Sequence, residues 1–281
     1  MSKGRLLISA DDFGMTAGVN RGIVGALERG DITSTAIIFG HPGTVEALQL
    51  AASLPVRDLG LHVNLTDGRP VSHDPRLRPL LGADGRFRGR RWLTYLAARG
   101  ELDHDGVRAE VVAQLGVCLD RGLTLTHADS HHYLHALPGI GEVIASCVAD
   151  AGIPLVRTTG WRCLASPLAR AAVGRSSSGS LDPDGVPRPA SDAVIALSTP
   201  PTGPFPIRVV RRLLDTVGSG VAELVAHPGY ADADLAACSK YVHGRQLELE
   251  LLASPDFKQA IEDSGLRVTT FAALARGGLE D

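Results

Sequence analysis

Residues 5–30 read "RLLISADDFGMTAGVNRGIVGALERG" and contain the two kinds of pattern that decide the fold. The run at 5–10 is short and apolar, which is typical of a buried strand. Over 17–30 the apolar side chains fall on one helical face, and Gly30 is a residue that often ends helices. This stretch therefore predicts a strand followed directly by a helix.

The same alternation continues to the end of the chain. We expect further strands at 34–39, 59–65, 123–129, 153–158, 193–198, 221–227 and 266–271, and helices at 41–54, 105–121, 138–151, 207–217 and between 244 and 264. Strands separated by helices indicate parallel βαβ units. The pattern favours an α/β, (β/α)-barrel-like fold of about seven strands, with room for an irregular barrel short of one strand. In such a fold the chemistry lies at the carboxyl ends of the strands.

Two segments do not follow the alternation. Residues 66–91 are rich in Pro, Gly and Arg without a clear period, and we expect a long loop there. Residues 174–192 are polar and rich in Ser and Pro, which predicts a mobile surface loop. We interpret that loop as an insertion, so that 1–281 forms a single domain.

Composition excludes several classes of function. The net charge is -3 and no run is rich in Lys or Arg, so no nucleic-acid partner is expected. The N-terminus has no signal-peptide pattern, and no apolar run approaches the roughly 20 residues of a membrane span. The cysteines form no CxxC pair, which favours free thiols in a reducing compartment: Cys118, Cys147, Cys163 and Cys238. We therefore predict a cytoplasmic protein.

Polar motifs occur where four of the predicted strands end. Asp11 and Asp12 follow the first strand, His62 lies near the end of the third, and His227 precedes a Pro-Gly turn after the strand at 221–227. The most concentrated motif is "HADSHHYLH" at 127–135, with four of the ten histidines of the chain.

Each motif has a structural explanation when it is taken alone. The aspartate pair could cap the next helix, although Thr16 is also a candidate N-cap. His62 could be a hydrogen-bonded core histidine, and His227 a polar turn residue. Four imidazoles near a core, however, cost solvation unless they are paired or bound. Together the motifs therefore favour a metal site.

Imidazole and carboxylate ligands suit Zn²⁺, with Mg²⁺, Mn²⁺ or Co²⁺ as alternatives. Of two adjacent aspartates, one could bind the ion while the other acts as general base toward the activated water. A histidine opposite them, such as His227, could protonate the leaving group. This arrangement suits hydrolysis of an amide or ester. The sequence has no GxSxG elbow, GxGxxG fingerprint or P-loop, so serine-hydrolase, dinucleotide and ATP chemistry are not expected.

The motifs "ISADDFG", "LGLHVNLTDGRPV", "HADSHHYLH" and "ELVAHPGY" resemble those of the YdjC-like carbohydrate deacetylases, a family that includes chitooligosaccharide deacetylases and a hopanoid-associated branch. The resemblance covers about residues 5–275. It implies a (β/α)-barrel-like fold and metal-dependent removal of acetyl from an N-acetylated amino sugar. On the matching positions it implies Asp11 as general base, Asp12, His62 and His131 as ligands of one divalent ion (Mg²⁺ or Zn²⁺), and His227 as general acid.

The resemblance also implies roles around this centre. His127 and Asp129 would orient the ligands, while His132 and His135 either line the sugar site or only pack. Asn64 and Tyr230 are candidates for substrate contacts. The aromatic residues that could stack on a sugar are few: Trp92, Tyr95, Trp161, Phe205 and Tyr230. The family commonly has a third consecutive histidine where this chain has Tyr133, so the substrate is less firmly implied than the ligands.

Two alternatives stay open. A barrel phosphoesterase or another amidohydrolase could use paired ions, with His127, His132 and His135 as additional ligands. A non-catalytic sugar-binding protein would be expected to lack Asp11 or His227, and both are present. The expected partner is an oligosaccharide or glycoconjugate substrate, and the family resemblance suggests a homodimer.

Overall fold

The computed structural model describes residues 4–54, 58–157, 188–197, 203 and 205–277. In chain order its elements are β1 (Arg5–Phe13), α1 (Ala17–Glu28), β2 (Ser34–Ile38), α2 (Thr44–Ala51), β3 (Leu59–Val63), η1 (Pro75–Leu80), α3 (Arg90–Ala98), α4 (His104–Leu119), β4 (Leu125–Ser130), η2 (His131–Ala136), α5 (Ile140–Asp150), β5 (Leu155–Val156), β6 (Arg188–Pro189), β7 (Ala193–Ala196), α6 (Ile207–Leu214), β8 (Val221–Ala226), α7 (Ala233–Cys238), α8 (His243–Ala253), α9 (Pro255–Ser264), β9 (Arg267–Val268) and α10 (Phe271–Ala275). Within these ranges no helix has the length and apolar character needed to cross a membrane.

The nine strands of the described residues form one sheet, in the order β6-β5-β4-β3-β2-β1-β8-β7, with β9 beside the start of β1. All the named strand pairs are parallel. Among the described residues no pairing joins β6 to β7, so the curled sheet is open between these strands. This confirms the predicted (β/α)-barrel-like fold in its irregular form.

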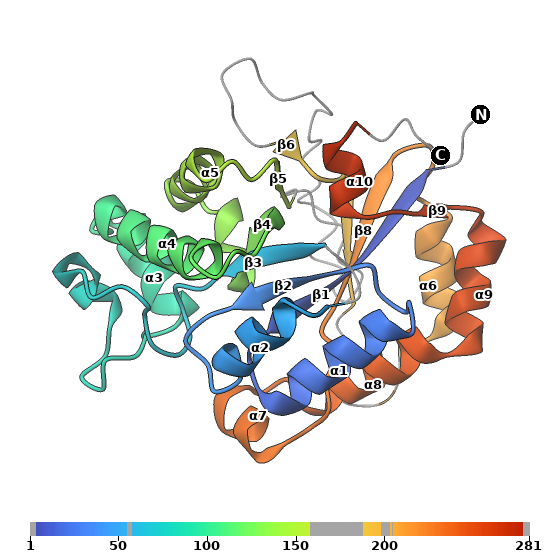
Figure 1. Ribbon diagram of the computed structural model, residues 1–281, viewed down its shortest axis with the longest axis horizontal. Coiled ribbons are helices and arrows are strands. Elements are labelled where there is room, and N and C mark those ends of the chain that lie inside the picture. Colours follow the sequence, from blue (N-terminus) through green and yellow to red (C-terminus); the bar gives the residue numbers. More distant parts are fainter. Residues whose placement is uncertain (1–3, 55–57, 158–187, 198–202, 204, 278–281) are drawn as a thin grey trace.

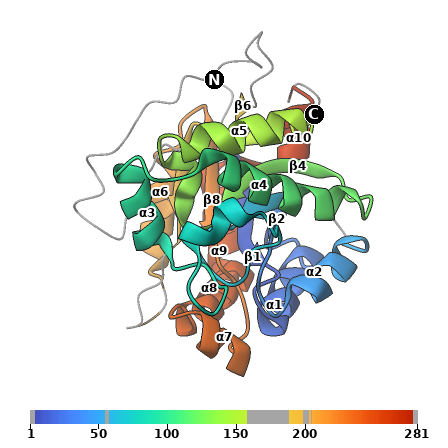
Figure 2. The same ribbon diagram turned by 90° about the vertical axis from the view of Figure 1, so that its left-hand side faces the viewer.

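Helices cover the outside of the sheet. Figure 1 shows α3, α4 and α5 beside β3, β4 and β5, with α1, α2, α7 and α8 on the adjoining side and α6 and α9 beyond β8; Figure 2 shows the same layer from the side. The apolar residues of β1 are buried, as expected for a strand that lies between helices and the barrel interior. Because the strands are parallel, their carboxyl ends share one rim.

The opposite end of the barrel is closed by α10. The carboxylate of Asp58, just before β3, accepts hydrogen bonds from the backbone amides of Phe271 (2.7 Å) and Ala272 (2.9 Å) and from the hydroxyl of Thr126 (2.8 Å). The ring of His127 stacks on Phe271 with centroids 3.6 Å apart. These contacts fix α10 to β3 and β4 at the end of the barrel away from the rim.

Several elements differ from the sequence prediction. Strand β1 continues through Phe13, beyond the predicted end at residue 10, with an irregular register between Ala10 and Phe13. The predicted loop at 66–91 contains η1 and ends in the first residues of α3, and neither α3 nor α7 was expected. These short helices bury only a few apolar residues each, which leaves little periodic signal. Of the predicted loop at 174–192, residues 174–187 lie outside the described residues, and β6 forms immediately after them.

Candidate active site

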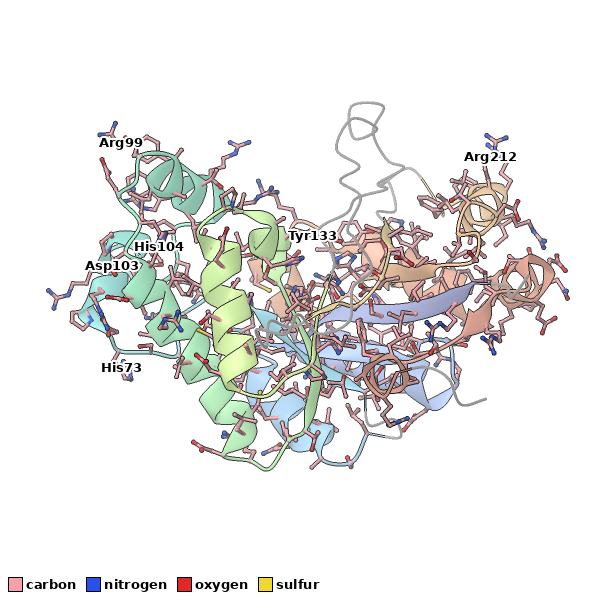
Figure 3. The ribbon with its side chains drawn as sticks, turned by 90° about the horizontal axis from the view of Figure 1, so that it is seen from above. His73, Arg99, Asp103, His104, Tyr133 and Arg212 are labelled. Carbon is pink, nitrogen blue, oxygen red and sulfur yellow. The ribbon has the colours of Figure 1, made fainter. Side chains whose placement is uncertain are left out.

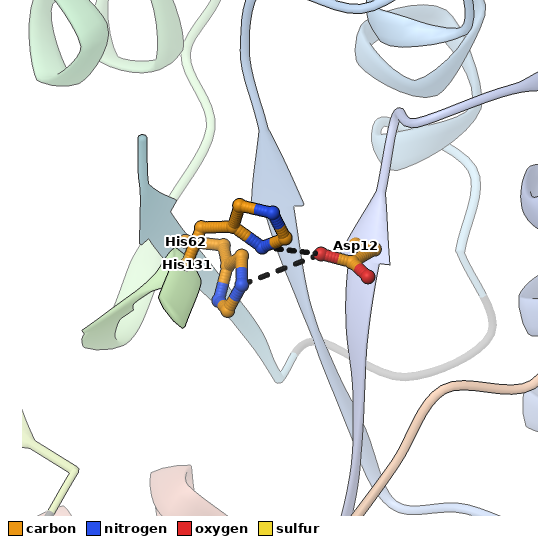
Figure 4. Close-up of side chains that lie close together, drawn as sticks. All are labelled: Asp12, His62 and His131. Atoms are coloured by element: carbon orange, nitrogen blue, oxygen red, sulfur yellow. Dashed lines mark ion pairs between the residues drawn. The ribbon is translucent and has the colours of Figure 1, made fainter. Parts of the chain in front are cut away.

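Three buried side chains converge at the carboxyl-terminal rim. Asp12 lies near the end of β1, His62 near the end of β3, and His131 directly after β4. Figure 4 shows both imidazole rings facing one oxygen of Asp12. Asp12 Oδ1 lies 3.4 Å from His62 Nε2 and 3.1 Å from His131 Nδ1, and the three potential ligand atoms lie within 4.8 Å of one another.

The backbone at Asp12 brings both aspartates to this site. In a regular strand, neighbouring side chains point to opposite faces. Asp12 instead has φ 71°, a left-handed conformation that Asp tolerates better than most residues, where the register of β1 is irregular. As a result Asp11 and Asp12 both approach His62, at 4.0 Å from Nδ1 and 3.4 Å from Nε2. A strained residue at a cluster of potential ligands is typical of a functional site.

The donor set fits a divalent ion. Asp12 Oδ1 is fully buried yet has no hydrogen-bond partner among the described residues, so the atom lacks the partner that a cation would supply. The other oxygen of Asp12 accepts a hydrogen bond from Arg245 Nη2 at 2.5 Å. Burial tends to raise the pKa of Asp12, but Arg245 and His131 outweigh it and hold the pKa well below its usual value. One carboxylate oxygen and two imidazole nitrogens form a set that Zn²⁺ and related ions accept.

Each of the two histidines is held from behind by a carboxylate. Asp129 lies 2.8 Å from Nδ1 of His62, and Asp67 lies 3.0 Å from Nε2 of His131. Burial tends to lower the pKa of both imidazoles, but the facing carboxylates outweigh it and raise both pKa values. A carboxylate on the second nitrogen is the usual support of a metal-binding histidine. Asp129 was predicted to orient a ligand; Asp67 was not, although it lies in the "NLTDG" motif.

Asp11 faces a buried arginine that sequence reasoning missed. Arg157, the first residue after β5, is 1% exposed. Its Nη1 and Nη2 donate to the two oxygens of Asp11 at 2.8 and 2.7 Å, it forms an ion pair with Asp129, and its Nε donates to Glu223 at 2.9 Å. The guanidinium thus orients Asp11 and links it to the carboxylate behind His62. The only signal in the sequence is a lone arginine at the end of an apolar run.

Asp11, Asp12, His62 and His131 line a cavity of about 600 Å³. His227, which follows β8, also lines it, so the cavity contacts all five residues to which the family resemblance assigns a role. His132 and Tyr133 also line it. Both have left-handed backbones, with φ 58° and 56°, and Figure 3 shows Tyr133 near the middle of the molecule.

Other predicted site residues lie elsewhere. His127 packs deep in the barrel against Phe271, and the buried His135 contacts Ser130 Oγ through Nδ1 at 2.6 Å. Asn64 is buried, and its side chain bonds to backbone atoms of the loop that carries Asp67. Tyr230 is exposed and does not line the cavity. These side chains therefore shape the site's surroundings or the surface, rather than the cavity wall.

The aromatic candidates that fall within the described residues also lie outside the cavity wall. Trp92 stacks on Tyr95 with ring centroids 5.3 Å apart, while the guanidinium groups of Arg88 and Arg99 lie over Trp92 and Tyr95. Both rings thus contact each other and neighbouring arginines, and neither lines the cavity. Phe205 is buried, and Trp161 lies outside the described residues.

His41, after β2, is a further residue that the sequence reasoning did not single out. It is 8% exposed, its ring lies 6.4 Å from that of His131, and within the described part of the chain neither ring nitrogen has a hydrogen-bond partner. Burial and the neighbouring His131 lower the pKa of His41 to about 4, so the ring is neutral at physiological pH. His41 packs edge-on to His131 and does not line the cavity.

The chain is similar to known proteins over nearly its whole length. Residues 5–263 match the family model described as YdjC-like protein. A carbohydrate deacetylase of Vibrio vulnificus is 32% identical over 276 residues, covering 96% of each chain, and a human carbohydrate deacetylase is 33% identical, covering 94% of this chain and 89% of its own. A crystal structure of a proposed cellobiose-phosphate cleavage protein from Enterococcus faecalis superposes with a TM-score of 0.79 at 26% identity, covering 97% of this chain and 99% of the other.

Proposed function

Because this chain belongs to the YdjC-like protein family, we propose that it is a metal-dependent carbohydrate deacetylase that removes acetyl from an N-acetylated amino sugar. The observation that carries the proposal is the convergence of Asp12, His62 and His131 in a cavity that Asp11 and His227 also line. A phosphoesterase or another amidohydrolase is the alternative that the chemistry leaves open.

In this proposal Asp12, His62 and His131 hold one divalent ion, Mg²⁺ or Zn²⁺. Such an ion would polarise the amide carbonyl and lower the pKa of water for attack on it. Asp11 would take the proton from the attacking water. Arg157 occupies one position on each oxygen of Asp11, and a carboxylate oxygen can accept further hydrogen bonds. His227, which lines the same cavity, would donate a proton to the departing amine of the sugar.

The geometry favours one ion over two. Two further possible groups each share a histidine with the first: Asp67, His131 and His132 share His131, and Asp11, His62 and Asp129 share His62. One nitrogen of each shared histidine faces Asp12, and the other faces Asp67 in His131 and Asp129 in His62. A second ion would therefore require one of these histidines to bind metal through both nitrogens and lose its supporting carboxylate. We therefore expect one metal equivalent per chain, whereas a two-metal phosphoesterase would bind two.

The test is acetate release from a panel of N-acetylated sugars, from N-acetylglucosamine and its disaccharide to lipid-linked and nucleotide-linked forms, with metal-stripped and metal-restored protein. Release only after metal is restored is the expected result. If protein that holds one equivalent of metal releases no acetate from any sugar of the panel, that result would count against deacetylation. Phosphoesters would then be assayed as substrates.

Variants separate the proposed roles. His131→Ala should lose both bound metal and acetate release, whereas Asp11→Asn should retain the metal and lose turnover. His243→Ala, on the exposed first residue of α8, is the matched control and should keep both. Full activity in Asp11→Asn would exclude Asp11 as the general base, and full metal occupancy in His131→Ala would exclude His131 as a ligand.

A further inference from the structure

Helix α8 carries two buried charged residues that contact different residues of the proposed site. Arg245 is 2% exposed and Glu248 is 0% exposed. Residues three apart in a helix share one face. Arg245 donates to Asp12 Oδ2 at 2.5 Å, and Glu248 reaches His227. One helical face therefore contacts both the proposed metal carboxylate and the proposed acid.

Glu248 contacts His227 at two points. Its Oε2 accepts the backbone N–H of His227 at 2.5 Å and lies 3.6 Å from Nδ1 of the same residue. Its other oxygen, Oε1, accepts a hydrogen bond from the hydroxyl of Tyr241. The 3.6 Å separation is longer than a hydrogen bond, but such contacts are often long in free enzymes and shorten when substrate binds. The carboxylate is thus held on both sides, facing one nitrogen of His227.

The fold places Tyr241 against this helix by means of a glycine. A β-carbon at Gly244 would lie 2.3 Å from Cζ and 2.5 Å from the hydroxyl oxygen of Tyr241, closer than any side chain allows. The ring therefore packs directly on the bare backbone of α8, and it also lies edge-on to His227 with centroids 5.8 Å apart. The position of the Tyr241 hydroxyl is consequently determined by backbone packing.

We propose that Glu248, held by Tyr241, is the positioning residue of His227. It fixes the imidazole with Nδ1 toward α8 and leaves Nε2 for the substrate. A carboxylate on one nitrogen selects the tautomer and orientation of a histidine that acts through the other. Glu248 does not itself line the cavity. This inference rests on the proposed function for the role of His227, but the geometry of the pair can be tested without any substrate.

The first measurement is the ¹⁵N NMR signature of His227 in Zn²⁺-loaded protein. In the unmodified protein we expect a proton on Nδ1 directed toward Glu248, both in the neutral ring and in the imidazolium that would donate from Nε2. Glu248→Gln and, more weakly, Tyr241→Phe should mix the two tautomers. Glu250→Gln is the matched control, because Glu250 is exposed on the same helix and its carboxylate accepts a hydrogen bond from Gln246 rather than from a residue of the site. An unchanged His227 signature in both variants would overturn the proposal.

The second measurement is kinetic. Glu248→Gln should lower kcat by about 10- to 100-fold, in the range expected when support of an acid–base histidine is lost. KM and bound metal should stay unchanged. Loss of metal, or an equal fall with Glu250→Gln, would instead indicate a general structural defect and contradict the assignment. If Glu248→Gln fails to fold, Tyr241→Phe carries the test, because it keeps the carboxylate and removes only its hydroxyl donor. A tautomer change without acetate release by the unmodified protein would refute the proposed function while leaving the positioning pair intact.

Discussion

Replacing Arg157 by methionine should destabilise the protein strongly. Arg157 is 1% exposed and is the shared partner of three buried carboxylates, Asp11, Asp129 and Glu223. Methionine keeps much of the side-chain length but removes the charge and every hydrogen-bond donor. Removing one partner of a buried ion pair costs about 3–5 kcal/mol, because the remaining charge stays buried without compensation. We expect a loss in this range in the free energy of unfolding, a large part of the 5–15 kcal/mol of a typical domain.

The assay is urea unfolding of metal-free protein, followed by circular dichroism at neutral pH. The matched control is Arg99→Met. Arg99 also has a carboxylate partner, Glu101 at 2.6 Å, but the side chains are 56% and 46% exposed. An exposed ion pair contributes about 0–1 kcal/mol, so the control should change the free energy of unfolding by no more than that.

The loss in the free energy of unfolding caused by Arg157→Met should also depend on pH. Burial tends to raise the pKa of Asp129, but Arg157 and His62 outweigh it and hold the pKa below its usual value. A depressed carboxylate pKa stabilises the folded state above the unfolded pKa of about 3.9, and that stabilisation disappears as the pH falls through the folded pKa. The difference between Arg157→Met and the unmodified protein should therefore be largest near neutrality and shrink below about pH 4. A difference below about 1 kcal/mol at neutral pH, or one that does not shrink in acid, would refute the reasoning.

Three further predictions concern residues outside the cavity. Burial lowers the pKa of His127 to about 4, so the free energy of unfolding should fall as the pH drops from about 6.5 to 4. In urea unfolding, His127→Gln should reduce the slope of this free energy against pH by about 1.4 kcal/mol per pH unit. An unchanged slope would contradict a buried neutral imidazole. Asp58→Ala removes the acceptor of two backbone amides and one hydroxyl, and should lower the free energy of unfolding by about 2–4 kcal/mol. Amide hydrogen exchange should become faster in α10 before it does elsewhere. An equal increase in exchange across the whole protein would argue against a local role. Burial raises the pKa of the Cys118 thiol to about 12, so iodoacetamide at pH 8 should modify this residue only when the protein is unfolded in urea. Peptide mapping would identify the modified cysteine. Rapid labelling of Cys118 in the native protein would contradict its burial.

The sequence by itself determined the order of elements and where the chemistry would be found. Apolar periods and glycines indicated the strands and helices of a parallel α/β fold. Since the carboxyl ends of parallel strands meet at one rim, the aspartate pair, His62, the histidine-rich motif and His227 were expected together before any contact was known, and the family resemblance selected Asp12, His62 and His131 among them. The structure places them within one cluster. The period of a strand or helix is a local property, which is why it can be read without the fold.

Only the tertiary structure decided which side chains support these residues. Arg157 meets Asp11 across 146 positions of sequence, and Arg245 meets Asp12 across 233. The left-handed turn at Asp12 brings two consecutive side chains to the same site, against the alternation of a regular strand. His127 belongs to the same histidine-rich motif as His131 but lies deep in the barrel against Phe271. Sequence spacing reports which face of an element a residue occupies, whereas the packing of distant elements determines which faces meet.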